Sequence, residues 1–350
     1  MRDAAGLLRV TDRGVWCAAG DFYIDPWLPV DRAVITHAHG DHARRGSAAY
    51  LCSAEGERVL RTRIGDDQFI EAVPYGETRE INDVRVSLHP AGHILGSAQV
   101  RIEHRGEVWV VSGDYKTEPD PTCAPFELVR CHTFVTESTF GLPIYRWPSQ
   151  DDVFARISEW WRINAEAGRA SVLLGYALGK AQRLLAGLIG REHGPIYAHG
   201  AVERLNADYR ASGVVLPSTL HATQPRGTSF GNALIVAPPS AGASPWLRRF
   251  GEYSAAFASG WMRVRGVRRR RGVDRGFVLS DHVDWPSLLD TVHATGAEHV
   301  LVTHGYREEV ARYLSGVGVD AQVLPALWKG EGEGEGEGEG LGQGEAPAAQ

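Results

Sequence analysis

Short apolar runs separated by polar loops mark the first 140 residues of the chain. Each run is followed by polar residues or by glycine. The clearest runs are Ala33–Ile35, Val84–Val86, Val108–Val111 and Phe134–Val135. Short runs bounded by turn residues are typical of buried strands. This part of the chain is therefore predicted to be a strand-rich domain whose loops carry the polar side chains.

The pattern changes at Ser149. Apolar positions recur at helical spacing over Asp151–Ala167, with Ser149 or Asp151 as its cap, and over Gly179–Ile189. Apolar strands alternate with these helices and continue beyond them, at Leu173–Leu174, Ile196–Tyr197, Leu234–Val236, Gly276–Ser280 and His299–Thr303. Alternating strands and helices are typical of a parallel α/β unit.

The composition of the 350 residues, 43% hydrophobic and 23% charged, is that of a globular protein and excludes a wholly disordered chain. No apolar stretch approaches about 20 residues, and no apolar segment follows the N-terminal methionine, so neither a membrane span nor secretion is predicted. The four cysteines have no CxxC spacing, as expected for reduced thiols. We therefore expect a cytoplasmic protein without a membrane partner.

The net charge of −6 is unevenly distributed. Residues 330–350 contain six Glu and no basic residue, which leaves 37 acidic against 37 basic residues in the rest of the chain. Because alternating Gly and Glu cannot bury apolar surface, 330–350 is predicted to be a disordered tail. Arginines are dense between Arg263 and Arg275 and are preceded by Arg248 and Arg249. They are either a solvated face or strand, or a phosphate-binding strip.

The strongest chemical signal is the segment after the run Ala33–Ile35. It places three imidazoles and a carboxylate within six residues, at His37, His39, Asp41 and His42. Imidazole nitrogens and carboxylate oxygens suit zinc and related divalent ions. A loop that follows a rigid strand can direct such ligands at one or two points, so this segment predicts a metal site.

One loop cannot complete two coordination shells, and further polar residues stand at other predicted strand ends. They are His93 between glycines, Asp114 after an apolar run, and His304 after another. Asp25 follows Phe22–Ile24 and is a candidate for fixing the tautomer of a ligand imidazole.

The order of these motifs resembles the metallo-β-lactamase fold and, specifically, its β-CASP branch of nucleic-acid-processing enzymes. Three further motifs carry the β-CASP resemblance: Glu137 in Thr-Glu-Ser-Thr-Phe-Gly, His282 in Leu-Ser-Asp-His-Val-Asp and His304 in Val-Thr-His-Gly. The segments 137–147 and 259–262 resemble the bacterial ligase-associated DNA exonucleases, which are also labelled mRNA 3′-end processing factors.

The resemblance implies an α/β fold, an αββα sandwich with an inserted domain. Residues 1–150 and 273–329 would form the metallo-β-lactamase domain and 151–272 the β-CASP α/β insertion. Two divalent metal ions are implied, zinc or alternatively manganese. His37, His39 and His93 would hold one ion, Asp41, His42 and His304 the other, and Asp114 would bridge them. The implied catalytic residues are Asp41, Asp114, Glu137 and His282, with His282 protonating the leaving oxygen and Glu137 orienting its imidazole.

The implied function is 5′-to-3′ exonuclease action on DNA ends in repair, with a preference for a 5′-phosphate and with a DNA ligase and helicase as pathway partners. Candidates for the terminal-phosphate pocket are Lys116, Ser138, Thr139, Lys180, Ser259, Gly260 and Trp261. A ribonuclease is the second hypothesis, since Glu137 and His304 look like the RNA-cleaving members. A small-molecule metallohydrolase is the third. One departure from the family is Asp281, where the family has alanine in a Ser-Ala-His segment.

Overall fold

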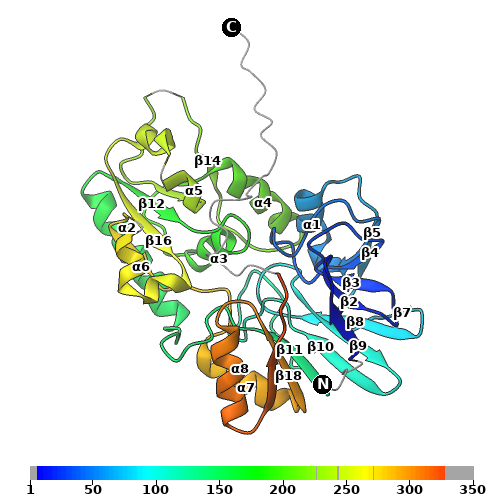
Figure 1. The fold of residues 1–350 in the computed structure, drawn as a ribbon. Helices are drawn as coiled ribbons and strands as arrows, with labels where there is room; N and C mark the ends of the chain where they lie inside the picture. The colour runs from blue at the N-terminus through cyan, green and yellow to red at the C-terminus, as the bar shows by residue number, and fades with distance from the viewer. Residues whose placement is uncertain (1–5, 226, 243, 271, 328–350) are drawn as a thin grey trace.

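The structure is a computed structural model that describes residues 6–225, 227–242, 244–270 and 272–327. The predicted tail over 330–350 lies outside the described residues. Three β-sheets and their covering helices make up the described part of the chain, with the third sheet to one side of the other two (Figure 1). This confirms the predicted α/β class. Within this part of the chain no helix is both long and apolar enough to cross a membrane.

Two sheets pack face to face. Side chains such as Phe22 and Val100 from the two inner faces share one buried core. The first sheet has strands β1 (Leu8–Val10), β2 (Val15–Cys17), β3 (Phe22–Ile24), β4 (Arg32–Val34), β5 (Ala49–Ser53) and β6 (Ile70–Val73). The second has the order β19-β18-β11-β10-β9-β8-β7, with β7 (Thr78–Ile81), β8 (Val84–Pro90), β9 (Ala98–His104), β10 (Glu107–Val111), β11 (Thr133–Glu137), β18 (His299–Thr303) and β19 (Asp320–Val323).

Helices cover the outer faces of these two sheets. The short helix η1 (Ala54–Gly56) leads into α1 (Glu57–Ile64), which buries Val59 and Leu60 against the first sheet. Helices α7 (Trp285–Thr295) and α8 (Arg307–Gly316) pack on the second sheet. The layers are therefore helix, sheet, sheet and helix.

The third sheet has the order β14-β13-β15-β12-β16-β17, and every adjacent pair in it is parallel. Its strands are β12 (Ala170–Leu174), β13 (Ile196–Ala198), β14 (Leu220–His221), β15 (Leu234–Ala237), β16 (Tyr253–Ala258) and β17 (Arg275–Phe277). One face is covered by α2 (Gln150–Glu166), α3 (Lys180–Gly187) and α4 (Gly200–Ala211), and the other by α5 (Pro239–Gly242) and η2 (Pro245–Phe250).

Two predicted elements differ from the structure. The strand expected over Gly276–Ser280 is β17, which ends at Phe277, because the chain then turns toward the other two sheets. The arginine run forms a short helix, α6 (Arg265–Arg270), after η3 (Gly260–Arg263), rather than a strand. Neither helix shows an apolar period from which it could be predicted.

Strands of both packed sheets end at one edge. Pairing makes β8, β10, β11 and β18 parallel to one another, so their carboxyl ends lie together. The loop after β4 of the first sheet meets this edge, and Gly113 permits the contact: a Cβ there would lie 2.7 Å from the Cβ of Thr36. The polar residues singled out in the sequence stand in these loops.

Candidate metal centre

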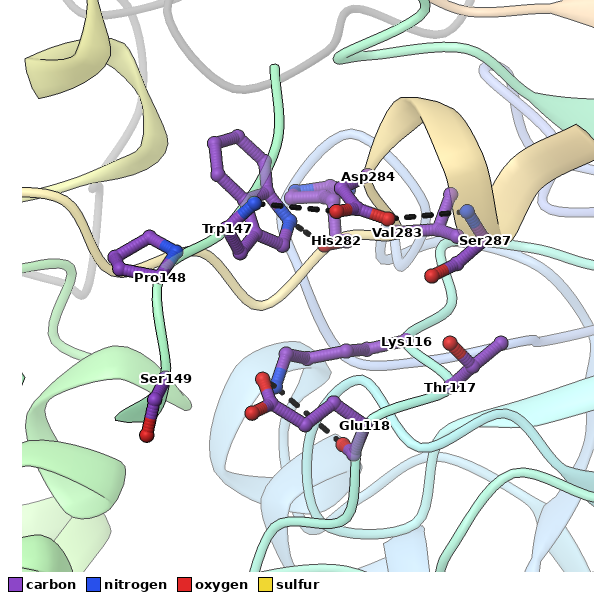
Figure 2. Close-up of a pocket in the computed structure, with 10 residues that line it drawn as sticks. All are labelled: Lys116, Thr117, Glu118, Trp147, Pro148, Ser149, His282, Val283, Asp284 and Ser287. Atoms are coloured by element: carbon purple, nitrogen blue, oxygen red, sulfur yellow. Dashed lines mark hydrogen bonds and ion pairs between the residues drawn. The ribbon is translucent and has the colours of Figure 1, made fainter. Parts of the chain in front are cut away.

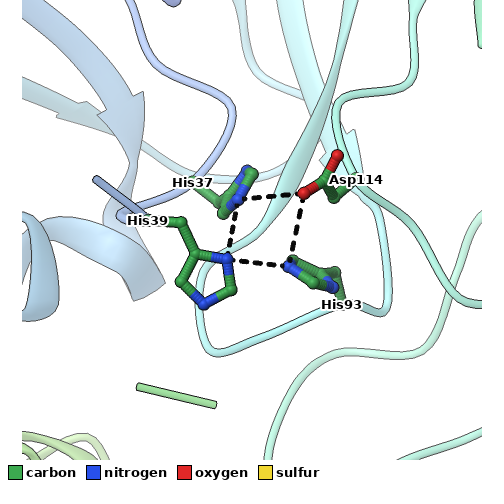
Figure 3. A group of neighbouring side chains, drawn as sticks. All are labelled: His37, His39, His93 and Asp114. Carbon is green, nitrogen blue, oxygen red and sulfur yellow. Dashed lines mark hydrogen bonds and ion pairs between the residues drawn. The ribbon is translucent and has the colours of Figure 1, made fainter. Parts of the chain in front are cut away.

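Four side chains from three loops converge at this edge. His37 and His39 follow β4, His93 follows β8, and Asp114 follows β10. One ligand atom from each lies within 4.8 Å of the others (Figure 3). His37, His93 and Asp114 are buried, so these groups are shielded from water.

The distances between these ligand atoms fit tetrahedral coordination of one metal ion. His39 Nδ1 lies 3.1 Å from both His37 Nε2 and His93 Nε2. Asp114 Oδ2 lies 3.5 Å from His37 Nε2 and 3.8 Å from His93 Nε2. Tetrahedral ligands on bonds of about 2.1 Å stand about 3.4 Å apart.

The outer partners of the rings indicate that lone pairs face inward. His93 Nδ1 lies 2.8 Å from the carbonyl of Asp281, and His39 Nε2 lies 3.2 Å from that of Leu178. Because a carbonyl only accepts, these outer nitrogens carry the protons. The inner nitrogens then present lone pairs to one another at 3.1 Å, which a cation would stabilise.

A second group lies on the other side of Asp114. Asp41, His42 and His304 bring ligand atoms within 4.8 Å of one another. His42 Nε2 is 3.3 Å from His304 Nε2 and 3.6 Å from Asp114 Oδ2. Asp114 Oδ1 is buried and has no hydrogen-bond partner among the described residues, and it lies 3.9 Å from His304 Nε2. The residues present therefore fit two divalent ions that share Asp114.

Asp25 contacts the second group through the ring nitrogen of His42 that faces away from Asp114. Its Oδ2 lies 2.7 Å from His42 Nδ1, and its Oδ1 accepts a hydrogen bond from the Thr36 amide at 2.8 Å. Asp25 and His304 both have positive φ, +42° and +56°, which non-glycine residues rarely adopt. Such backbone strain persists where surrounding contacts enforce it, and it is frequent at functional sites.

Charge is unevenly distributed between the two groups. Burial and neighbouring histidines lower the pKa of His37, His93 and His304 well below the usual value. Burial also opposes the charge on His42, but Asp41, Asp114 and Asp25 raise its pKa to about 10. Burial raises the pKa of Asp114 to about 7, against the effect of His42. In the metal-free chain, the second group therefore holds a proton at neutral pH.

We expect metal binding to release protons and to tighten as pH rises. A metal ion must displace the proton of His42, whose pKa of about 10 keeps it protonated at pH 7. Affinity should rise about tenfold per pH unit for each proton displaced. Calorimetric titration of zinc in buffers of different ionisation heat counts the protons. The variant His42→Asn, which has no such proton, is the control, and equal proton release by both chains would contradict the expectation.

A buried carboxylate–imidazole pair stands beside the two groups. Glu137, the last residue of β11, has its Oε2 2.8 Å from His282 Nδ1. Glu137 Oε1 also accepts a hydrogen bond from the Tyr115 amide at 2.8 Å. The ring of His282 is centred 4.7 Å from that of His93. With Asp114, this pair also brings three ligand atoms within 4.8 Å. Glu137 can orient the imidazole and stabilise its charge.

The predicted phosphate-pocket residues do not all lie together. Lys116 lines a cavity of about 160 Å³ with Trp147, Ser149 and His282 (Figure 2). Its ammonium lies 2.7 Å from Glu118 Oε2, and burial together with Arg183 lowers its pKa to about 8. The remaining candidates do not line this cavity.

Five of these candidates are held by other parts of the fold. Ser138 and Thr139 are buried, and Ser138 Oγ lies 3.0 Å from the carbonyl of Thr303. Ser259 Oγ accepts a hydrogen bond from the Trp261 amide at 3.3 Å. Gly260 packs so closely on Phe140 that a Cβ would lie 2.5 Å from its ring. The ring of Trp261 is centred 4.9 Å from that of Phe140. Gly260 and Trp261 thus pack on Phe140, whose ring is centred 5.8 Å from that of His282.

Lys180 belongs to a buried charge network. Its ammonium lies 2.8 Å from Asp281 Oδ2, and Arg183 reaches Asp281 Oδ1 at 2.9 Å and Asp120 Oδ2 at 3.2 Å. The carboxylate of Asp281 therefore faces α3 rather than His282. Arg183 and Asp120 were not identified from the sequence, because Arg183 and Asp281 stand 98 positions apart. The network connects α3 to Asp281, whose carbonyl contacts His93 and which directly precedes His282.

Asp281→Ala should destabilise the chain by about 3–5 kcal/mol, because it removes the buried carboxylate that contacts both Lys180 and Arg183. Urea unfolding of the metal-free chain measures this loss. The double variant Asp281→Ala/Lys180→Met removes both charges, leaves Asp120 for Arg183, and should recover part of the loss. Two variants of equal stability would show that the ion pair contributes little.

Comparison with known proteins gives relatives by sequence and by structure. No family model matches the chain. A protein named probable DNA ligase from Opitutus terrae is 31% identical over 311 residues, which cover 88% of this chain and 30% of that protein. The endoribonuclease YSH1 of Gibberella zeae is 34% identical over 119 residues, 33% of this chain and 14% of that protein. The transcription termination factor FttA of Pyrococcus abyssi is 33% identical over 229 residues, 52% of this chain and 34% of that protein.

The chain thus spans between 14% and 34% of the length of these three relatives. Among solved structures, a protein of unknown function from Enterococcus faecalis superposes with a TM-score of 0.55 at 11% identity, covering 84% of this chain and 79% of that one. This likeness concerns the fold alone. Together with the motifs, the sequence relatives support the β-CASP metallo-β-lactamase family.

Proposed function

We propose that the chain is a metal-dependent nuclease of this family that removes nucleotides from the 5′ end of DNA. The observation that carries the proposal is the pair of ligand groups sharing Asp114, with the His282–Glu137 pair beside them. In this proposal, residues 1–150 and 273–329 form the metallo-β-lactamase domain and 151–272 the β-CASP insertion. The relative named probable DNA ligase supports a role at DNA ends.

The residues have distinct roles in this proposal. When bound, two divalent ions, zinc or manganese, would polarise the scissile phosphate and lower the pKa of an attacking water. Asp114 faces both ligand groups and would hold the ions at a fixed separation. His282 donates a proton to the leaving oxygen, and Glu137 orients its ring and stabilises the charged form. Burial of all three keeps these interactions strong.

The terminal phosphate would bind at the cavity in Figure 2, next to His282. Lys116, whose ammonium lies 2.7 Å from the Glu118 carboxylate, lines it together with Ser149 and Ser287. Lys180 forms an ion pair with Asp281. It would therefore affect phosphate binding only indirectly, by positioning the segment that contains Asp281 and His282. In this proposal Ser138, Ser259 and Trp261 shape the pocket wall.

A ribonuclease is the second candidate. The names of two relatives, an endoribonuclease and a transcription termination factor, favour it, as do Glu137 and His304, which look like the RNA-cleaving members. A small-molecule hydrolase has no need of the third sheet. The substrate must therefore be established by experiment.

The deciding experiment is time-resolved digestion of matched DNA and RNA strands that carry a 5′-phosphate or a 5′-hydroxyl, with zinc or manganese added. A label at the 5′ end reports the first nucleotide released, and a label at the 3′ end reports the remaining strand. Consumption of 5′-phosphorylated DNA from its end while RNA survives would support the proposed exonuclease. Preferential or internal cutting of RNA would replace it with the ribonuclease.

A further inference from the structure

The carboxyl ends of the strands of the third sheet form one continuous edge, and part of that edge lies at the candidate metal centre. Its strands are parallel, so their carboxyl ends lie side by side. β12 leads to Leu178, whose carbonyl contacts His39, and β16 leads to Trp261, which packs on Phe140. β17 leads to Asp281. In open α/β sheets, ligands bind beyond the carboxyl ends of the strands.

The same edge continues past β15 to β13 and β14, where a second polar cluster lies. We name it the edge cluster: His199, His221, Trp246 and Arg249. His199 follows β13 directly, and its ring is centred 4.9 Å from that of Trp246. The Arg249 guanidinium lies 5.4 Å from the Trp246 ring centre. Only β15 separates β13 from β12, so the cluster begins about 10 Å from the end of β12.

The edge cluster combines aromatic rings with an arginine whose charge is not paired with a carboxylate among the described residues. Arg248 and Arg249 are exposed, and neither has a carboxylate within ion-pair distance in the part of the chain that the structure describes. Glu203, in the first turn of α4, is engaged by Arg210 at 3.1 Å. Burial lowers the pKa of His199, and the charges of His221 and Arg249 lower it further. The Trp246 ring therefore lies beside the unmatched charge of Arg249.

We propose that the edge cluster binds single-stranded nucleic acid, as a subsite for nucleotides beyond the one that reacts. Aromatic rings stack on bases of any sequence, and unpaired arginines bind phosphates; the two together are the chemistry of single-strand recognition. The inference rests on the proposed function, because the same strand would have its 5′ end at the metal centre. None of these four residues belongs to the predicted catalytic residues or to the predicted terminal-phosphate pocket; Arg249 is among the arginines for which the sequence offers a phosphate-binding strip.

The test is binding of a fluorescent strand of about 16 nucleotides, measured by anisotropy in a chelator so that no hydrolysis occurs. The variant His221→Gln/Arg249→Gln should bind about tenfold more weakly, with a salt dependence shallower by about 0.7 for each phosphate that the variant no longer binds. Arg156→Gln, an exposed arginine of α2, is the matched control and should bind like the unchanged chain. Both substituted residues of the double variant are exposed, so its urea midpoint should not move.

Hydrolysis of a strand of about 4 nucleotides, too short to reach the edge cluster, separates this inference from the proposed function. The double variant should hydrolyse it at the unchanged rate. If no chain hydrolyses any strand, the proposed function fails while the binding result still stands. Equal affinity of the double variant and the Arg156→Gln control for the long strand would overturn the inference. So would polyglutamate that displaces the strand at equal charge concentration, since the surface would then bind polyanions in general.

Discussion

Asp114→Asn is expected to lower the turnover of 5′-phosphorylated DNA by about 100- to 1000-fold, because the side chain faces both ligand groups and loss of a charge-stabilising contact can cost about 10²–10³ in rate. Metal content should fall from two ions per chain, since the asparagine amide is neutral and a weaker ligand. Initial rates and elemental analysis of the purified chain measure the two effects.

The fold should survive this substitution. Burial holds the pKa of Asp114 at about 7, above its unfolded value, so its contribution to stability is present at low pH and is lost as pH rises through 7. Above pH 7 the charged carboxylate destabilises the metal-free chain, and asparagine removes that charge. Urea unfolding of the metal-free variant at pH 8 should therefore show stability equal to or above that of the unchanged chain. A variant with normal turnover and two ions would refute the assignment.

His282→Ala should lower turnover of a DNA strand by about 10²–10⁴, the range for loss of a general acid. The imidazole is buried, and Glu137 Oε2 lies 2.8 Å from its Nδ1 and can fix the orientation of the ring. A p-nitrophenyl nucleotide ester supplies the decisive comparison, because its leaving group departs as a stable anion without a proton. On that ester the variant should come within about tenfold of the unchanged chain.

Glu137→Gln is the companion variant, since glutamine keeps the size of the side chain and removes its charge. We expect a smaller loss on DNA than for His282→Ala, with two ions still bound. Equal losses on DNA and on the ester would instead mean that His282 acts as a metal ligand with Glu137 and Asp114, which the geometry of this third group permits. A fall in metal content of the Glu137→Gln variant would point the same way.

The sequence predicts which polar side chains come together at one edge, because each candidate ligand follows an apolar strand. His37, His93, Asp114 and His304 stand within a few residues of strand ends, and parallel pairing gathers such ends at one edge. The distances then follow from the fold. Their identity as ligands rests on the proposed function, and the facing lone pairs of His39 and His93 agree with it.

The surroundings of the site could not be predicted in the same way. Lys180 is expected from the sequence to bind phosphate, but Asp281 matches its charge at 2.8 Å. The residues next to Lys180 and Asp281 in the sequence do not indicate this pairing, because the two segments meet only when the third sheet packs on the other two. The helix formed by the arginine run could not be predicted either. Its sequence has no apolar residues at helical spacing, so no sequence pattern indicates a helix there.

The spread of the ligands along the chain also has a consequence for biosynthesis. His42 and His304 face each other at 3.3 Å from 262 positions apart, and His93 is oriented by the carbonyl of Asp281, 188 positions later. A ribosome adds about 5–20 residues per second. For many seconds the nascent chain therefore holds His37, His39 and His93 without the groups that complete the centre. In the proposed function, hydrolytic activity arises only after His304 has been added, so shorter nascent chains would not damage nucleic acid.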